Sequence, residues 1–167
     1  SDEVQRSGFP LPFLTLGTVG PTLMRHGTEA QRHEFLPSIL RGEMLFAIGY
    51  SEAGAGTDLA GLKTKAERDG DGWLINGAKM WTSLADHADY IWLAARTDPK
   101  AKKHRGISIF IVPTTAPGFK LTPIWTMADL RTNATYFDNV RVPARYLIGG
   151  ENNGWRLITS QLNHERV

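Results

Sequence analysis

The stretch Leu45–Asp58 reads LFAIGYSEAGAGTD, and a second stretch, Asn76–Ser83, reads NGAKMWTS. The first begins as a short apolar run that is typical of a buried strand, and it becomes small and polar from Ser51 onward. This change predicts a strand that opens into a tight loop. Two glycines one residue apart let such a loop approach a ligand closely or adopt positive φ, and Ser51 and Thr57 add hydroxyl groups. The loop is therefore suited to hold a planar polar ligand by its edge.

The composition limits the classes of protein to consider. A chain of 167 residues with 41% hydrophobic residues can bury a core, most simply as one compact domain with appendages. Lys and Arg number 19 against 17 Asp and Glu, so the nearly balanced charge gives no case for a nucleic-acid partner.

The chain has no cysteine, which excludes a disulfide framework and Cys-based metal sites, and its histidines have no metal-ligand spacing. No apolar run reaches the length of a membrane span, and the start, SDEVQRSG, is unlike a signal peptide. We therefore expect a cytoplasmic protein with no metal and no membrane partner.

Two helices are predicted before the first motif. Leu11–Arg25 carries apolar residues at a nearly helical period, interrupted by glycines and a proline. Gly27 can end this helix, and Thr28 followed three residues later by Gln31 is a capping-box pattern that starts a second helix, which runs to about Leu40. The second helix is expected to bury one apolar stripe, made of Phe35, Leu36, Ile39 and Leu40.

From Phe46 onward the pattern changes to a period of two, with β-branched and aromatic residues. Leu62, Thr64 and Ala66 alternate with charged residues, and Asp69–Gly72 predicts a hairpin turn. Since no helical crossover separates these short strands, the sequence predicts a small antiparallel β-barrel or sandwich, and the flanking helices make the fold class α+β. Further strands are expected at Tyr90–Ala95, Ile107–Val112, Phe119–Ile124 and Thr135–Val142.

A third helix is predicted after the Gly149–Gly150 pair, with Asn152 or Asn153 as its N-cap. Its apolar stripe consists of Trp155, Ile158 and Leu162. The chain ends within this amphipathic helix, so we expect it to be part of a longer protein.

The segment GYSEAGAGTDLAG, Gly49–Gly61, resembles the signature of flavin-dependent acyl-CoA dehydrogenases, and NGAKMWTS resembles that family's second flavin segment. Two motifs in the expected order are more specific than a lone Gly-rich loop. The resemblance implies that residues 1–44 end an N-terminal helical domain and that residues 45–148 form the middle β-domain. Residues 149–167 would then begin a C-terminal helical domain.

The resemblance also implies an FAD site. A flavin that accepts a hydride needs hydrogen-bond donors at its pyrimidine edge and an apolar or aromatic wall against its ring. Without the resemblance, Trp81 would be interpreted as an aromatic residue of the barrel core, and Ser51 and Thr57 as turn-capping residues. Thr57 is also expected to face the pantetheine of the substrate. The residues implied in FAD binding are Ile48, Tyr50, Ser51, Gly56, Thr57, Trp81, Thr82 and Ser83.

In this family a Glu carboxylate takes the α-proton of an acyl thioester while the β-hydride moves to flavin N5. Some members carry this base on the first C-terminal helix just before an Arg, so the sequence LNHERV makes Glu165 the candidate base. Arg166 and Asn163 are candidate substrate-binding neighbours. Helical spacing places Glu165 on the same face as Ile158, where a desolvated carboxylate could act as a base. The alternative is a solvated Glu165 paired with a polar neighbour.

Lys103 belongs to a basic cluster, Lys100–Arg105, that is predicted to lie in a loop between strands. It would bind the phosphates of coenzyme A, and the alternative is a solvated charged loop. Glu52 is expected to be a surface turn residue without a catalytic role, and Asp58 to cap a turn.

Together these observations predict FAD-dependent α,β-dehydrogenation of an acyl-CoA. The resemblance implies electron-transfer flavoprotein as the electron acceptor and a homo- or hetero-oligomer such as a homotetramer. An acyl-CoA oxidase or a flavin monooxygenase on the same scaffold is the alternative within the flavin class. A non-catalytic β-barrel binding or assembly module is the alternative outside it. Because family members complete the site with C-terminal helices and a neighbouring subunit, the isolated chain is expected to bind FAD poorly and to be inactive.

Overall fold

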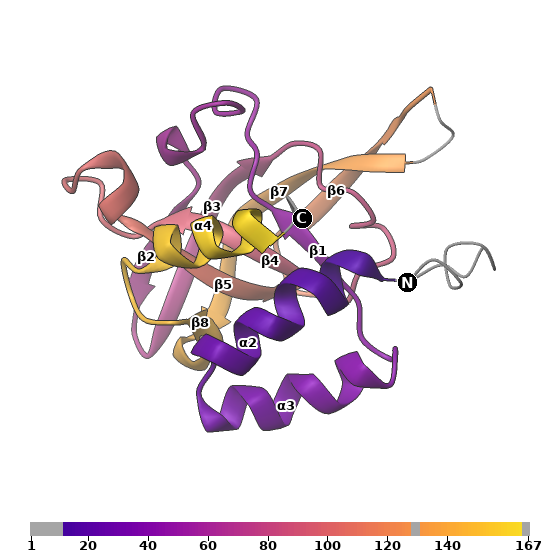
Figure 1. Cartoon of the computed structure of the whole chain (residues 1–167). Coiled ribbons are helices and arrows are strands. Elements are labelled where there is room, and N and C mark those ends of the chain that lie inside the picture. The colour runs from indigo at the N-terminus through magenta and orange to yellow at the C-terminus, as the bar shows by residue number, and fades with distance from the viewer. Residues whose placement is uncertain (1–11, 128–130, 165–167) are drawn as a thin grey trace.

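The computed structural model describes residues 12–127 and 131–164 (Figure 1). The helical elements are the π-helix η1 (Thr15–Val19), the α-helices α2 (Gly20–His26), α3 (Glu29–Leu40) and α4 (Gly154–His164), and the 3-10 turns η2 (Leu59–Gly61), η3 (Lys103–Arg105) and η4 (Ala144–Tyr146). The strands are β1 (Phe46–Gly49), β2 (Lys65–Asp69), β3 (Gly72–Lys79), β4 (Tyr90–Arg96), β5 (Ile107–Pro113), β6 (Phe119–Trp125), β7 (Arg131–Pro143) and β8 (Leu147–Ile148).

The helix predicted over Leu11–Arg25 is confirmed for the described residues, with one irregularity. Its first part, η1, is a π-helix in which the Gly20 N–H donates to the Thr15 carbonyl, five residues back. Pro21 follows directly and has no N–H, so the regular hydrogen-bond ladder cannot run through this turn. Gly27 ends α2, as predicted.

The N-terminus of α3 forms the predicted capping box. Thr28 Oγ1 accepts the Gln31 N–H at 3.2 Å, and Gln31 Oε1 accepts the Thr28 N–H at 2.8 Å. Phe35 and Ile39 are buried, but Leu40 is 78% exposed, so its placement in the apolar stripe is wrong. The buried face instead follows residues 31, 35 and 39, at intervals of four, which leaves the next position on the flank of the helix.

The described strands form one eight-stranded sheet in the order β6-β7-β3-β2-β4-β5-β8, and β1 pairs with β4 beside this path. Most pairs are antiparallel, including the predicted β2–β3 hairpin with Asp69 opposite Gly72. Two pairs are parallel: Phe46–Gly49 of β1 along β4, and a single Lys65–Arg96 position between β2 and β4. The α+β fold class is confirmed, and the sheet remains open instead of closing into a barrel.

The middle of the sheet is buried on both faces. In β4, Trp92 belongs to the core cluster that includes η1, α2, α3 and α4 residues, whereas Ile91 and Leu93 belong to a second cluster among the strands. Trp73 of β3 contacts Phe110 of β5 edge to face at 5.2 Å between centroids, although these strands are not neighbours in the sheet. The sheet therefore folds over itself like a sandwich, and the helices cover its other side (Figure 1).

Helix α4 packs against β5 and brings the end of the described chain back to α2 and β1 (Figure 1). Gly154 lets the helix approach β5 closely, because an added Cβ would lie 2.8 Å from the Ile107 carbonyl oxygen. Ile158 is buried, as predicted, whereas Leu162 is 38% exposed. Leu157 and the polar Gln161 occupy the rest of the buried face. Asn153 directly precedes the helix and donates to the Gly149 carbonyl at 2.8 Å.

Candidate functional site

The two motif segments meet at a hollow of about 210 Å³ beside the end of β1. Five residues predicted to bind the cofactor line it together: Ile48, Tyr50, Ser51, Trp81 and Ser83. Leu14, from the start of the first helix, and Leu162, from α4, complete the lining. The hollow thus draws on all three predicted parts of the chain.

Trp81 is the exposed aromatic wall of this hollow. Trp81 is 59% exposed, and its backbone φ is 60°. This is a left-handed conformation that residues with bulky side chains rarely adopt. Trp81 is therefore not a residue of the β-core, contrary to the interpretation without the resemblance. Backbone strain of this kind persists where the surrounding structure fixes it, and it gathers at ligand sites.

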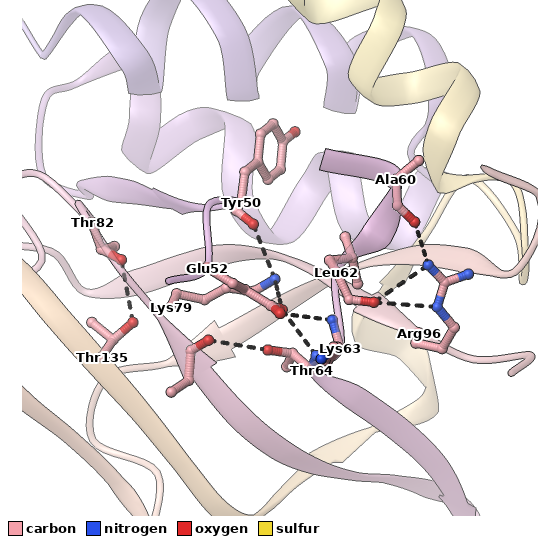
Figure 2. A network of polar contacts seen from close by, with 11 residues as sticks. Tyr50, Glu52, Ala60, Leu62, Lys63, Thr64, Lys79, Thr82, Arg96 and Thr135 are labelled. Carbon is pink, nitrogen blue, oxygen red and sulfur yellow. Dashed lines mark hydrogen bonds and ion pairs between the residues drawn. The ribbon is translucent and has the colours of Figure 1, made fainter. Parts of the chain in front are cut away.

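Thr82 points away from the hollow, between its two exposed neighbours. It is fully buried, its N–H donates to the Asn133 carbonyl at 2.9 Å, and its hydroxyl lies 3.2 Å from the Thr135 hydroxyl (Figure 2). Thr82 anchors this segment to β7, and a direct contact of its side chain with a ligand of the hollow is not supported. Ser83 returns to the hollow, with its hydroxyl 3.3 Å from that of Thr132.

The glycine-rich loop itself lies beside the hollow. Gly56 and Thr57 are exposed and do not belong to the lining of the hollow. Neither Gly54 nor Gly56 has positive φ, and the space where a Cβ would stand is open at both. Of the two uses predicted for these glycines, only close approach by a ligand remains.

Lys103 lies next to this loop through an ion pair. Its Nζ is 2.5 Å from Asp58 Oδ2, and both side chains are exposed. Arg96 reinforces the contact, because its guanidinium donates to the carbonyl of Lys103 at 2.6 Å and to that of Ala60 at 2.6 Å (Figure 2). The basic cluster and the motif loop are thus held together, although they are far apart in sequence.

Tyr50 connects the hollow to the interior through its side chain. Its hydroxyl accepts the indole N–H of Trp92 at 3.1 Å and donates to Gln161 Oε1. The Gln161 amide in turn donates to Thr22 Oγ1 at 2.8 Å, and this hydroxyl donates to the Thr18 carbonyl at 2.8 Å. Every member is buried, and the chain of hydrogen bonds joins β4, the residue after β1, α4, α2 and η1.

A buried ion pair behind the hollow was missed by the sequence interpretation. Lys79 Nζ, which is fully buried, lies 2.8 Å from Glu52 Oε1 and donates to the Tyr50 carbonyl at 3.1 Å (Figure 2). Glu52 also accepts the N–H groups of Lys63 at 2.7 Å and Thr64 at 2.9 Å. Glu52 is thus an interior anchor, and its expected role as a surface turn residue is wrong.

Burial shifts the titration of this pair. It lowers the pKa of Lys79 to about 8, against the opposing attraction of Glu52 and with a further lowering by the charge of Arg96. Burial by itself raises the pKa of Glu52, but the charge of Lys79 and the hydrogen bonds from Lys79, Thr64 and Lys63 together lower it below its ordinary value. A signal for Lys79 existed in the sequence, because it lies four residues after Ile75 and six after Trp73, on the side of the strand that these two buried residues share.

Some predicted residues lie beyond what the structure describes. Glu165 and Arg166 are outside the described residues, and the side chain of Asn163 is as well, so their roles stay predictions. Within residues 12–127 and 131–164, no three His, Cys, Asp or Glu side chains gather closely enough to hold a metal ion. No helix in that part of the chain is long and apolar enough to cross a membrane.

The lining of the hollow suits a flat, partly polar ring. Trp81 offers an aromatic face, Ser51 and Ser83 offer hydroxyl groups, and Ile48 and Leu162 are aliphatic. An isoalloxazine ring needs this combination of an apolar wall and edge hydrogen-bonding groups. The fold and the hollow therefore define a class: an α+β domain with a partly aromatic, partly polar hollow between two motif segments.

Comparison with known proteins identifies the family. The model for "Acyl-CoA dehydrogenase, middle domain" matches residues 47–140, more than half of the chain. The chain belongs to the acyl-CoA dehydrogenase family. It is 59% identical over 170 residues to acyl-CoA dehydrogenase FadE26 of Mycobacterium tuberculosis, covering 100% of this chain and 42% of that protein. It is 60% identical over 168 residues to FadE29 of the same organism, covering 99% and 43%.

Solved structures agree with these relatives. The Tcur3481-Tcur3483 steroid ACAD matches with 61% identity and a TM-score of 0.96, over 99% of this chain and 43% of the solved chain. The ChsE4-ChsE5 complex from Mycobacterium tuberculosis matches with 59% identity and a TM-score of 0.92, over 98% and 42%. The chain thus spans about two fifths of the length of its relatives.

Proposed function

We propose that this chain is part of an FAD-dependent acyl-CoA dehydrogenase that introduces a double bond between the α and β carbons of an acyl-CoA thioester. The observation that carries the proposal is the convergence of both motif segments on one hollow with an exposed indole. In this assignment residues 45–148 are the middle domain, between the end of one helical domain and the start of another.

Within this proposal the residues of the hollow hold and orient the flavin. Trp81 would stack against the ring, while Ser51, Ser83 and the backbone at Tyr50 would hydrogen-bond to its edge. FAD, when bound, supplies the acceptor for the hydride of the β-carbon. The open space around Gly56 would admit the rest of the cofactor, with Thr57 and Lys103 contacting the coenzyme A portion of the substrate.

Glu165 is proposed as the base that takes the α-proton, with Arg166 and Asn163 beside the thioester. The described part of α4 supports this placement, because Leu162 lines the hollow and positions three and four apart share a helix face. Residue 165 follows Leu162 by three.

The substrate class and partners are proposed from the relatives. The 61% identity to a steroid ACAD supports a steroid-derived acyl group, and two of the matching structures are titled as pairs of chains, which supports a hetero-oligomer. Electron-transfer flavoprotein is the proposed electron acceptor and the cytoplasm the proposed location.

The test is anaerobic reduction of the full-length protein by a panel of acyl-CoAs. The loss of flavin absorbance measures the rate of reduction. We expect a CoA thioester with a steroid side chain to bleach the flavin faster than a straight-chain acyl-CoA. Glu165→Gln should lose reduction by at least about a hundredfold, as expected for a general base. The matched control, Glu29→Gln, changes an exposed carboxylate on α3 and should behave like the parent.

Three results would change the proposal. If no acyl-CoA bleaches the flavin, dehydrogenation is wrong and a binding or assembly module is favoured. If Glu165→Gln reduces flavin as fast as the parent, the base is another residue. Rapid reoxidation of the reduced protein by oxygen would favour an acyl-CoA oxidase or a monooxygenase.

A further inference from the structure

Burying the Glu52–Lys79 ion pair costs desolvation free energy. The Lys79 side chain is fully buried and that of Glu52 is 10% exposed, so both charges have lost most of their hydration. Burying an ion pair is often no more stabilising than packing apolar residues of the same volume. A contribution to the stability of the fold is therefore a weak explanation for this pair. Its position next to the hollow suggests a role there instead.

The pair lies directly behind both walls of the hollow. Lys79 donates to the Tyr50 carbonyl, and Tyr50 and Ser51 line one side of the hollow. Two residues after Lys79 comes Trp81, the opposite wall, and between them the Met80 N–H donates to the Ser51 carbonyl at 2.9 Å. Figure 2 shows the Tyr50 ring directed toward the helices while its carbonyl faces Lys79.

Glu52 fixes the pair to a third segment. Its carboxylate accepts two backbone N–H groups, from Lys63 and Thr64, just before β2. Because Gly77 places its backbone against Thr64, with an added Cβ only 2.6–2.8 Å from that residue, the end of β3 has little freedom to shift. The ammonium of Lys79 is thus held from both sides.

We infer that Glu52 and Lys79 are positioning residues for the flavin site: together they set the separation and orientation of the Tyr50–Ser51 wall relative to Trp81. This inference rests on the proposed function, since it assigns the hollow to the flavin. Neither side chain lines the hollow, so both act through the backbone that they hold. The left-handed backbone of Trp81 is one conformation that such an anchor would maintain.

The test compares Lys79→Met and Phe110→Leu in the full-length protein. Phe110 packs against Trp73 in the strand cluster and does not line the hollow, so its variant controls for a general loss of stability. For each protein the melting temperature of the apo form, the FAD dissociation constant and the visible circular dichroism of bound flavin are measured. The dichroism reports the asymmetric contacts of the ring, which a merely structural role would leave unchanged.

We expect Lys79→Met to weaken FAD binding by at least about tenfold relative to Phe110→Leu and to change the flavin dichroism. Glu52→Gln is the milder second variant for the case that Lys79→Met does not fold, and it should shift both readouts in the same direction. If the variants of the pair bind FAD within twofold of the control with the parental dichroism, the inference is overturned. A parent protein that binds no FAD would overturn the proposed function together with it.

Discussion

Tyr50 takes part in two separate hydrogen-bond systems through opposite ends of one residue. Its carbonyl receives the Lys79 ammonium, and its hydroxyl lies between Trp92 and Gln161. The sequence interpretation assigned Tyr50 to the flavin on the basis of the motif alone. The structure adds that the residue also ties the hollow to α4 and to the helical core.

The hydroxyl of Tyr50 is predicted to contribute to stability. Tyr50→Phe leaves the indole N–H of Trp92 and the Oε1 of Gln161 without this buried partner, so the free energy of unfolding should fall by about 1–3 kcal/mol. The measurement is urea unfolding, with Tyr136→Phe as the control because Tyr136 is exposed. Equal stabilities of the two variants would contradict the prediction.

The titration of Lys79 gives a prediction with a definite sign. Its folded-state pKa of about 8 lies below the ordinary value of 10.5, so between these values the unfolded chain binds a proton that the folded protein lacks. The free energy of unfolding of the parent should therefore rise by up to about 3 kcal/mol over this interval, relative to Lys79→Met. The charged groups that face Lys79 are Glu52 and Arg96.

The measurement is a series of urea-unfolding curves for both proteins from pH 7.5 to pH 10.5. The titration of groups that both proteins share cancels in the difference between their free energies of unfolding. A difference that stays constant with pH would show that Lys79 keeps an ordinary pKa despite its burial.

At the scale of the elements, the side chain of Gln31 makes two kinds of hydrogen bond that hold α3 in place. Gln31 completes the capping box with Thr28, and its amide Nε2 donates to the carbonyls of Arg145 at 2.6 Å and Leu147 at 2.9 Å. The same side chain thus starts the helix and docks it onto the segment around η4 and β8.

Two alanine variants should separate these roles. Thr28→Ala removes only the cap and should cost about 1 kcal/mol of stability. Gln31→Ala also removes the side-chain donor to two carbonyls and should cost about 2–4 kcal/mol. Denaturant unfolding measures both, and equal costs would mean that the contacts to Arg145 and Leu147 contribute nothing.

The accuracy of the sequence interpretation depended on how local each feature is. The capping box at Thr28 and the Asp69–Gly72 hairpin were predicted because neighbouring residues determine them. The parallel pairing of β1 with β4 could not be predicted, because it joins Phe46 to Tyr90 through long-range packing. The exposure of Leu40 was missed because periodicity gives a face of the helix but not the limits of that face.

At the scale of the whole molecule, the motifs predicted which two segments meet but not what supports them. Five of the eight residues predicted to bind the cofactor line the hollow, but Lys79 stood unnoticed inside the second motif, since lysine usually lies at the surface. Its partner Glu52 is 27 residues away in sequence, and only the folded chain brings them together.

The size of the hollow leads to a prediction about the isolated chain. About 210 Å³ is below the range of roughly 300–1,000 Å³ that is common for ligand sites, and the hollow is shallow. The 167-residue chain alone should therefore bind FAD at least about a hundredfold more weakly than the full-length protein. Fluorescence titration of both with FAD measures this, and tight stoichiometric binding by the chain alone would contradict it.

The docking of α3 by Gln31 has a consequence for the order of events during synthesis. The carbonyl of Leu147 that receives this side chain lies 116 residues further along. At about 5–20 residues per second a ribosome needs roughly 6–23 s to translate that interval. The bond from Gln31 to Leu147 therefore forms at least that long after α3 has been made, whereas Phe46, which packs against Phe35, follows α3 almost at once.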